Sequence, residues 1–262
     1  MDEKMHVNAM DTLFTHLREV SPLAIALSGG LDSRFLAHAA RLASCDILLL
    51  HASGPHVSPR ESERAKLWAA GQGLTLRVIP FDPLALPAVA ENTMERCYFC
   101  KKALLETLHP HAAAYTLCDG TQADDLLHSH RPGLRALKEA GLRSPLAEIG
   151  IGKTQIRELA AFSGLTQAGQ PARPCLLTRL AYGMRPDARI LARLAAAETE
   201  LEDSGLDDFR LRLTPSPQLH VTILPQDMQK VARVLAVNGF AGAQVVRVET
   251  LSGYFDRKEP KD

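Results

Sequence analysis

The stretch Leu23-Ala24-Ile25-Ala26-Leu27-Ser28-Gly29-Gly30-Leu31-Asp32-Ser33 decides the fold. It begins as an apolar run typical of a buried strand, turns at two glycines, and continues from Asp32 with apolar residues at helical spacing. Glycines at such a junction let backbone N–H groups approach a phosphate, and the helix N-terminus adds partial positive charge. The pattern predicts a phosphate-binding loop, with hydroxyl donors at Ser28 and Ser33 and a divalent cation on Asp32. The alternative is an ordinary turn between a strand and a helix.

The following residues repeat the same alternation of strand and helix. An apolar run at Ile47–His51 predicts a second strand, Ser58–Gly71 a helix, and Leu74–Pro80 a third strand. This βαβαβ order predicts an α/β fold with a doubly wound parallel sheet. Further along we expect two helices and a strand, at Thr93–Leu108, Ile156–Phe162 and Ala114–Cys118.

The pattern of apolar residues in the sequence changes after Tyr182-Gly183. Alanine and leucine at helical spacing are followed by short strand-like runs, which predicts a small α+β domain in the order helix, strand, strand, helix, strand. We therefore expect a domain boundary at residue 184, with domains at 1–183 and 184–262. The expected elements of the second domain are Pro186–Gly205, Phe209–Leu213, Leu219–Leu224, Asp227–Asn238 and Ala243–Glu249.

Composition excludes several classes of protein. Of 262 residues, 46% are apolar and 23% charged, an ordinary globular balance. The 30 Lys and Arg equal the 30 Asp and Glu, so no net positive charge attracts a nucleic acid non-specifically. No apolar run approaches the roughly 20 residues of a membrane span, and the first residues lack the order of a secretion signal. We expect a cytoplasmic protein without a membrane or nucleic-acid partner.

Five cysteines are present. Cys45 and Cys118 adjoin apolar runs, where free cysteine is usually buried and inert. Cys97, Cys100 and Cys175 have charged or polar neighbours and turn formers around them, so we expect chemistry there. The Cys-x-x-Cys spacing of the first two alone is ambiguous, because half a zinc site, a redox pair and coincidence all produce it.

The hexad from Ser28 to Ser33 resembles the PP-loop of the ATP pyrophosphatases, which cleave ATP between the α and β phosphates. The resemblance implies that Ser28, Gly29, Gly30 and Ser33 cradle the pyrophosphate and that Asp32 binds Mg²⁺. The loop pattern of kinases and P-loop motors is absent from the sequence. Arg34 departs from the small residue that many relatives carry, and we expect it either near the phosphates or facing solvent.

Further motifs resemble the LarE family of ATP-dependent sulfur transferases, which act in nickel-pincer cofactor synthesis. The resemblance runs from the PP-loop to about Gly183 in a single order. Its motifs are Arg96-Cys97-Tyr98-Phe99-Cys100-Lys101-Lys102, Asp119-Gly120-Thr121-Gln122-Ala123-Asp124-Asp125, Arg131-Pro132-Gly133-Leu134-Arg135, Ser144-Pro145-Leu146 and Pro171-Ala172-Arg173-Pro174-Cys175-Leu176-Leu177-Thr178-Arg179.

This resemblance implies a two-stage reaction. Family members adenylate a carboxylate of a pyridinium dicarboxylate mononucleotide, and the cysteine that matches Cys175 attacks the acyl-adenylate. In the sacrificial form the Cβ–S bond of that cysteine then breaks, which leaves dehydroalanine on the protein and a thiocarboxylate on the product. The local sequence suits a reactive thiolate, because Arg173 and Arg179 flank Cys175 and nearby cations lower a thiol pKa. Arg179 is therefore a candidate catalytic residue, and a buried structural thiol is the alternative for Cys175.

Some LarE relatives carry two further cysteines in the segment that matches Cys97 and Cys100. There the three cysteines resemble ligands of a [4Fe–4S] cluster whose fourth iron is open to an extra sulfide. The resemblance thus implies Cys97, Cys100 and Cys175 as cluster ligands, with zinc or no metal as the alternatives. Sacrifice of Cys175 and transfer from a cluster both remain open, and we favour the cluster.

Other charged residues are candidates for holding the nucleotide. Asp124 and its neighbour Asp125 follow a strand at the end where parallel sheets bind ligands, so they suit Mg²⁺ or a ribose. Lys101 and Lys153 suit a pyrophosphate. A solvated or helix-capping role for the aspartates, and a surface position for the lysines, are the alternatives.

Two departures from the family concern the substrate. Gln167-Ala168-Gly169-Gln170 stands where relatives usually carry an aromatic and a basic residue, and the C-terminus ends differently after Tyr254. The alternative functions are therefore a tRNA-thiolating PP-loop enzyme and a non-catalytic nucleotide-binding protein. Relatives oligomerise through the C-terminal region, so we expect a homo-oligomer built from trimers, with a small-molecule nucleotide as substrate.

Overall fold

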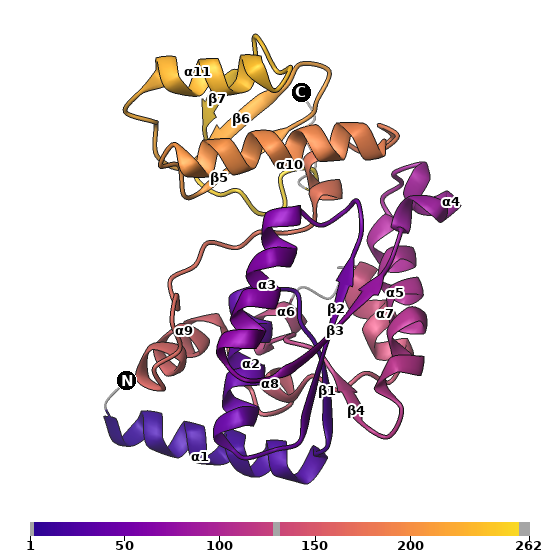
Figure 1. Cartoon of the computed structure of the whole chain (residues 1–262), viewed down its shortest axis with the longest axis vertical. Coiled ribbons are helices and arrows are strands. Elements are labelled where there is room, and N and C mark those ends of the chain that lie inside the picture. Colours follow the sequence, from indigo (N-terminus) through magenta and orange to yellow (C-terminus); the bar gives the residue numbers. More distant parts are fainter. Residues whose placement is uncertain (1–2, 128–131, 257–262) are drawn as a thin grey trace. The chain divides into compact units, whose positions relative to one another are not determined.

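The computed structural model of the chain describes residues 3–127 and 132–256 (Figure 1). The chain divides into two compact units, each made of three segments. The first unit comprises Met1–Gly54, Glu61–Pro83 and Glu95–Arg173, and the second comprises Pro55–Arg60, Leu84–Met94 and Pro174–Asp262.

A four-stranded parallel sheet organises the first unit. Its strands are β1 (Leu23–Ala26), β2 (Ile47–Ser53), β3 (Thr75–Pro80) and β4 (Thr116–Cys118), in the spatial order β3-β2-β1-β4. All three pairings are parallel, and Ile25 at the centre pairs with Leu49 on one side and Cys118 on the other. The predicted parallel α/β sheet is confirmed.

Helices cover both faces of this sheet. Alternate strand residues point to opposite faces, so Ile25 and Leu49 pack into one apolar core while Ala24 and Leu48 pack into the other. The first core includes buried side chains of α1 (Glu3–Val20), α2 (Leu31–Leu42), α3 (Pro59–Gly71) and α9 (Lys153–Phe162). The second core is closed by Leu108 and Ala112 of α5 (Arg96–Ala112).

Helix α1 is present in the structure but is not among the elements predicted from the sequence. Its buried residues Met10, Leu13, Leu17 and Val20 recur three or four positions apart, which is the signature of an amphipathic helix. The other expected elements of this unit are present with slightly shifted ends, except that α5 begins at Arg96 rather than Thr93. The remaining short helices of the chain are η1 (Pro83–Ala85), α4 (Pro87–Ala90), α6 (Ala123–Leu126), α7 (Pro132–Glu139), α8 (Pro145–Glu148) and η2 (Leu176–Arg179).

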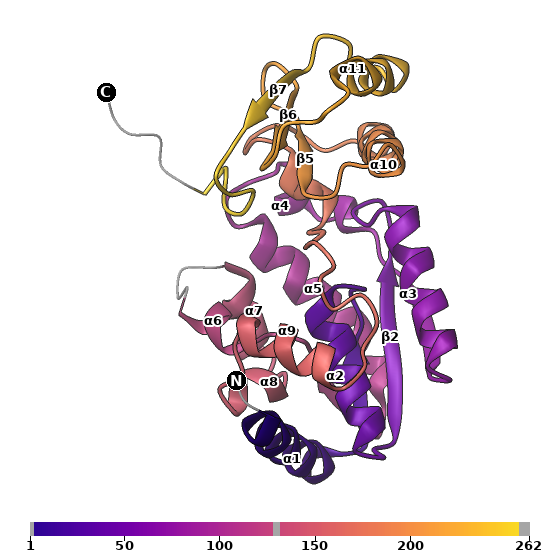
Figure 2. The same cartoon turned by 90° about the vertical axis from the view of Figure 1, so that its left-hand side faces the viewer.

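A three-stranded mixed sheet forms the second unit with α10 (Ala188–Asp203) and α11 (Met228–Val237). Both helices lie on one face of the sheet (Figure 2). The strand order is β5-β6-β7, with β5 and β6 antiparallel and β6 and β7 parallel. This confirms the predicted order helix, strand, strand, helix, strand. The strands are β5 (Phe209–Arg212), β6 (Gln218–Val221) and β7 (Gln244–Arg247).

The boundaries of the two compact units differ from those of the expected domains, 1–183 and 184–262. The second unit begins at Pro174 and also takes in two earlier segments. Hydrogen bonds explain this, because Leu176 N–H donates to the His56 carbonyl at 2.8 Å, and Arg60 makes two bonds of 2.7 Å to Asp203. Whether 1–183 and 184–262 fold independently stays a prediction.

Within the two described ranges, every helix is too short or too polar to cross a lipid bilayer.

Glu148 ties α1 to the start of α8. Arg143 donates two hydrogen bonds to the Glu148 carboxylate, at 2.8 and 2.7 Å, and the His16 imidazole of α1 lies 2.8 Å from it. The hydrogen bonds from Arg143 outweigh partial burial and lower the pKa of Glu148 from 4.5 to about 2. The ionised carboxylate is therefore the form that the fold stabilises.

We expect this carboxylate to make stability depend on acid pH. A folded-state pKa below the unfolded value stabilises the fold above the unfolded pKa, and that stabilisation is lost as pH falls from about 4.5 toward about 2. Arg143→Ala raises the pKa of Glu148, so the urea midpoint of this variant should fall less than that of wild type between about pH 5 and about pH 3. The exposed Arg41→Ala variant serves as control, and parallel curves for wild type and Arg143→Ala would contradict the assignment.

Candidate active site

The predicted phosphate loop lies where the strand order of the sheet reverses. Strands β1 and β4 are neighbours that run in the same direction, so the segments after Ala26 and after Cys118 leave the sheet at the same edge. Open parallel sheets bind ligands at this switch point. The structure thereby brings together Ser28–Ser33 and Asp119–Asp125, as their positions after strands predict.

The loop is held in shape by its own hydroxyls. Gly29 has a φ of +84°, a conformation that favours glycine. The Ser33 hydroxyl accepts from the Ser28 N–H at 3.2 Å and donates to the Gly30 carbonyl at 3.1 Å, while the Gly30 N–H donates to the Ser28 hydroxyl at 3.3 Å. Helix α2 starts at Leu31, and the N–H groups of its first turn have no partner within the helix. This geometry suits a bound phosphate.

Gly120 is a site residue that the motifs alone do not single out. A Cβ atom on Gly120 would lie 2.6 Å from the Ser33 nitrogen and 2.9 Å from the Asp32 carbonyl carbon. Both are backbone atoms of the phosphate loop, so any side chain at position 120 must displace that loop. The feature of the sequence that could have identified Gly120 is its position directly after β4, in Asp119-Gly120-Thr121.

We expect Gly120→Ala to impair the phosphate loop much more than global stability. A misplacement of about 1 Å in a reacting group can cost on the order of a hundredfold in rate, so pyrophosphate release from ATP should fall by about that factor. Gly71→Ala is the matched control, because a Cβ there meets nothing within 4 Å. Equal activity of the two variants would show that the contact with Ser33 does not matter.

Asp32, Asp124 and Lys153 lie together at the start of α9. The Lys153 ammonium contacts the Asp32 carboxylate at 2.6 Å, and the Lys153 backbone N–H donates to Asp124 at 2.7 Å. A Cβ on Gly152 would lie 2.8 Å from an Asp124 oxygen, so glycine leaves room for that carboxylate. Asp124 thus caps α9, while Lys153 supplies a cation beside Asp32.

Lys101 reaches the same edge of the sheet from α5. Its ammonium lies 3.7 Å from Asp119, a buried carboxylate at the end of β4. Asp119 also accepts from the Thr121 N–H at 3.1 Å, the Thr121 hydroxyl at 2.8 Å and the Ser144 hydroxyl at 2.8 Å. Asp119 therefore orders the turn around Gly120, and Ser144 supports it from a distant part of the chain.

The expectation that Arg34 faces solvent is wrong, and the expectation that it lies near the phosphates stays a prediction. Its side chain is buried, and its guanidinium donates to the carbonyls of Thr166 and Gln167 at 3.2 Å and to the Gln170 side chain at 2.5 Å. Burial lowers the pKa of Arg34 from its ordinary value. Arg34 thus fastens the chain after α9 to α2, and the unusual Gln170 is one of its partners.

Of the two cysteines expected to be buried, Cys118 is enclosed in the core, whereas Cys45 is only half-buried and packs against it. Cys118 is fully buried, and burial raises the pKa of its thiol to about 12; burial also raises that of the half-buried Cys45. Cys97 is exposed and Cys100 half-buried in the first turns of α5, three positions apart and so on one side of the helix. Cys175 belongs to the second unit. Among residues 3–127 and 132–256, no three His, Cys, Asp or Glu side chains are grouped to hold a metal.

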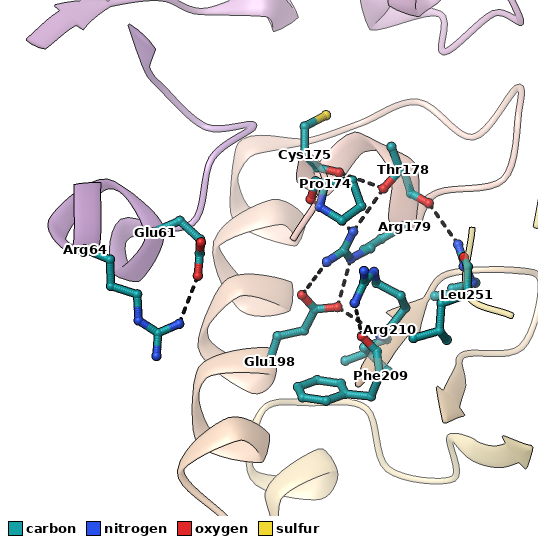
Figure 3. A network of polar contacts seen from close by, with 12 residues as sticks. Glu61, Arg64, Pro174, Cys175, Thr178, Arg179, Glu198, Phe209, Arg210 and Leu251 are labelled. Atoms are coloured by element: carbon teal, nitrogen blue, oxygen red, sulfur yellow. Dashed lines mark hydrogen bonds and ion pairs between the residues drawn. The ribbon is translucent and has the colours of Figure 1, made fainter. Parts of the chain in front are cut away.

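The backbone around Cys175 is fixed by a buried ion pair (Figure 3). Arg179, only 1% exposed, donates two bonds of 2.8 Å to Glu198 and one of 3.1 Å to the Pro174 carbonyl. The Cys175 carbonyl accepts from the N–H and hydroxyl of Thr178, at 3.0 and 2.8 Å. In Figure 3 the Cys175 sulfur points away from the ion pair.

Glu198 neutralises the cation that the sequence predicts to be catalytic. Burial alone raises the pKa of Glu198, but the charge and hydrogen bonds of Arg179 outweigh it and hold that pKa below its ordinary value. Glu198 also accepts from the Leu211 N–H at 2.9 Å, which joins α10 to β5. The structure thus places Arg179 as a support for the residue before Cys175, and its effect on the thiol pKa stays a prediction. Arg131 of the predicted motifs lies outside the described residues.

No protein-family model matches the chain. An uncharacterized protein of Synechocystis sp. is 35% identical over 207 residues, which cover 78% of this chain and 77% of that protein. An uncharacterized protein of Methanocaldococcus jannaschii is 31% identical over 212 residues, 80% of either chain. The pyridinium-3,5-bisthiocarboxylic acid mononucleotide synthase of Lactiplantibacillus plantarum is 30% identical over 206 residues, which cover 77% of this chain and 74% of the synthase.

The match to the synthase spans about three quarters of both chains and agrees with the resemblance drawn from the motifs. The phosphate loop at the switch point of a parallel sheet is the geometry that those motifs imply. The chain therefore belongs to the LarE family, the family of the pyridinium-3,5-bisthiocarboxylic acid mononucleotide synthase.

Proposed function

We propose that the protein is an ATP-dependent sulfur transferase that converts a carboxylate of a pyridinium dicarboxylate mononucleotide into a thiocarboxylate, in nickel-pincer nucleotide synthesis. The observation that carries the proposal is the 30% identity to the synthase over about three quarters of both chains, and the phosphate loop beside Gly120 at the switch point of the sheet supports its use of ATP. The name of the Lactiplantibacillus plantarum relative supplies the substrate class.

The residues at the switch point suit ATP and Mg²⁺. The N–H groups of the first turn of α2 and the hydroxyls of Ser28 and Ser33 are donors for phosphate oxygens. The Asp32 carboxylate is a ligand of the type that Mg²⁺ prefers, and Lys153 beside it is a cation for phosphate. We propose that nucleotide binding replaces the Asp32–Lys153 pair, with Asp32 on the metal and Lys153 and Lys101 on phosphate.

The proposed first half-reaction is an adenylation. A carboxylate oxygen of the substrate attacks the α-phosphorus of ATP, the bond to the β-phosphate oxygen breaks, and pyrophosphate leaves. The acyl-adenylate that remains has a good leaving group, which a free carboxylate lacks. The chain's part is to hold the triphosphate by Ser28–Ser33 and to orient it for attack.

The second half-reaction delivers sulfur to the acyl carbon, and Cys175 has a part in both versions of it. In the sacrificial version its thiolate displaces AMP to form a thioester. Loss of the Cα proton and cleavage of the Cβ–S bond then give dehydroalanine and the thiocarboxylate. In the cluster version Cys97, Cys100 and Cys175 would hold a [4Fe–4S] cluster that supplies exogenous sulfide, and AMP would leave as the acyl carbon receives that sulfur.

We favour the cluster version. Cys97 and Cys100 are thiol donors on one side of α5, and Cys175 is a third thiol whose side chain is half-buried rather than enclosed in a core. Anaerobic reconstitution with iron and sulfide, followed by iron analysis and intact-mass measurement after turnover, tests this. Iron near four per chain with unchanged protein mass is expected. A loss of about 34 Da without iron dependence would assign the sulfur to Cys175 instead.

Pyrophosphate release tests the proposed function against its alternatives. We expect ATP cleavage to AMP and pyrophosphate that depends on the pyridinium dicarboxylate mononucleotide. Dependence on tRNA instead would identify a tRNA-thiolating enzyme, although the zero net charge disfavours it. Nucleotide binding without cleavage would identify a non-catalytic protein, and ADP with phosphate would overturn the class.

We also propose a homo-oligomer built from trimers through the second unit. Large apolar side chains are exposed there, including Ile223 and Val237 at 82% each, with Leu224 and Met228 near the start of α11. Such residues on a surface are typical of an interface. A monomeric mass by light scattering at micromolar concentration would contradict the proposal.

A further inference from the structure

His51 is a buried residue of β2 that reaches the start of the phosphate loop. Its Nδ1 atom lies 2.8 Å from the carbonyl oxygen of Leu27, the residue directly before Ser28. Its Nε2 atom lies 3.0 Å from the hydroxyl of Ser62 in α3. One ring thereby joins the second strand, the chain that enters the loop, and a helix, all within the first unit.

The two partners determine where the His51 ring carries its proton. A carbonyl oxygen only accepts hydrogen bonds, so Nδ1 donates to Leu27, and Nε2 of the neutral ring accepts from the Ser62 hydroxyl. Burial outweighs the hydrogen bond to Leu27 and lowers the pKa of His51 from its ordinary value of 6.5, so the ring is neutral at pH 7. Both ring nitrogens therefore have a partner and a defined role.

The peptide group between Leu27 and Ser28 is held on both of its sides. Its carbonyl accepts from His51, and its N–H donates to the Ser33 hydroxyl at 3.2 Å. Because a peptide group is planar, fixing the direction of its carbonyl also fixes the direction of its N–H. The Ser28 N–H in turn places the Ser33 hydroxyl, which is one of the proposed donors to phosphate. The His51 ring therefore acts on the geometry of the loop through a single peptide plane.

Helix α3 supports the ring from the other side. A Cβ atom on Gly29 would lie 3.6 Å from the Glu61 carbonyl oxygen and 3.6 Å from the Ala65 Cβ, so the helix contacts the loop on either side of Ser62 in the sequence. The Ser62 hydroxyl also lies 3.4 Å from the Ser53 hydroxyl of β2. The position of the imidazole is thus fixed from the helix as well as from the strand.

We propose that His51 is a positioning residue for the phosphate loop, whose Nδ1–H holds the Leu27–Ser28 peptide group in the orientation that binds the nucleotide. The ring contacts no substrate in this proposal and acts through the Ser33 hydroxyl and the N–H groups that follow Ser28. The proposal rests on the proposed use of ATP, and it adds a residue that lies outside the loop motif itself.

Two amide substitutions separate the roles of the two ring nitrogens. In His51→Asn the amide nitrogen takes the place of Nδ1 and still donates to Leu27, whereas in His51→Gln it takes the place of Nε2 and leaves that carbonyl without its donor. His38→Gln is the matched control, because His38 is another buried histidine of the same unit. Its ring nitrogens lie 3.4 Å from the Gln72 side chain and 3.1 Å from the Ser163 carbonyl.

The first readout is the dissociation constant of α,β-methylene-ATP with Mg²⁺, measured by titration calorimetry on the full-length protein. We expect it to rise about tenfold in His51→Gln, because the binding-competent loop is then only a fraction of the population. It should stay within about twofold of wild type in His51→Asn and His38→Gln. Thermal unfolding of the same samples separates this effect from lost stability, since His38→Gln should lower the midpoint without weakening binding.

Nuclear magnetic resonance of the nucleotide-free protein gives the second readout. The imidazole ¹⁵N spectrum of wild type should show His51 in the Nδ1–H form, and the signal is assigned by its absence from His51→Asn. The amide signal of Ser28 should move further in His51→Gln than in His51→Asn, because only the first substitution frees the Leu27 carbonyl.

An Nε2–H ring in wild type, wild-type affinity in folded His51→Gln, or equal weakening in both His51 variants would overturn the proposal. The spectra distinguish its failure from failure of the proposed function. A wild-type protein that binds no nucleotide removes the use of ATP, while the form of the His51 ring and the Ser28 signal still decide whether His51 positions the loop.

Discussion

Asp32→Ala is expected to lower the rate of pyrophosphate formation by about a thousandfold or more, with the fold intact. In the proposed mechanism Asp32 binds the Mg²⁺ that neutralises the triphosphate, and such electrostatic stabilisation is usually a large share of catalysis. The side chain lies on the first turn of α2 and pairs with Lys153, so its loss leaves no apolar cavity. Steady-state pyrophosphate release measures the effect.

The matched control is Asp11→Ala, which removes an exposed carboxylate from α1 of the same unit. Its activity should be that of wild type. Circular dichroism and thermal unfolding confirm that both variants are folded. Asp32→Ala with activity within about tenfold of wild type would exclude Asp32 as the metal ligand.

Cys175→Ala is expected to abolish thiocarboxylate formation while AMP and pyrophosphate still form. Cys175 serves the second half-reaction in either version, as sulfur donor or as cluster ligand, and adenylation needs neither. Its side chain points away from the Arg179–Glu198 pair, so the substitution leaves the buried network in place (Figure 3). Single-turnover assays that separate nucleotide from sulfur products measure the split.

Cys45→Ala is the control for this experiment, because Cys45 is half-buried and its thiol pKa is raised by burial. Both half-reactions should survive in it. Wild-type yields of thiocarboxylate from Cys175→Ala would remove Cys175 from the mechanism. Loss of AMP formation together with sulfur transfer would assign Cys175 to the first half-reaction.

The sequence predicts those parts of the fold whose signal is local. The apolar runs at Leu23 and Ile47, separated by helical spacing, suffice for a parallel sheet, and the glycines after Leu27 identify its ligand-binding edge. Helix α1 carries an equally local signal in the spacing of its buried residues Met10 and Leu13, although it is not among the predicted elements.

The contacts that long-range packing creates could not be predicted. Gly120 and Ser33 meet only because β4 returns beside β1, and the bond from Arg34 to Gln170 joins positions 136 residues apart. Arg179 shows the same limit, since its proximity in sequence to Cys175 suggests a free cation while Glu198, 19 residues on, neutralises it. Residue type and spacing indicate which residues are candidates for catalysis. Whether the charge of such a side chain is neutralised depends on the partner that the fold brings to it.

A single-turnover reaction measures the central claim most directly. The protein, reconstituted with iron and sulfide, is mixed with ATP, Mg²⁺ and the pyridinium dicarboxylate mononucleotide, and all small-molecule products are quantified by mass spectrometry. We expect one AMP for each product molecule, and a product heavier by about 16 Da because sulfur replaces one carboxylate oxygen. AMP without that mass increase, or a sulfur product formed without cleavage of ATP to AMP, would contradict the proposed function.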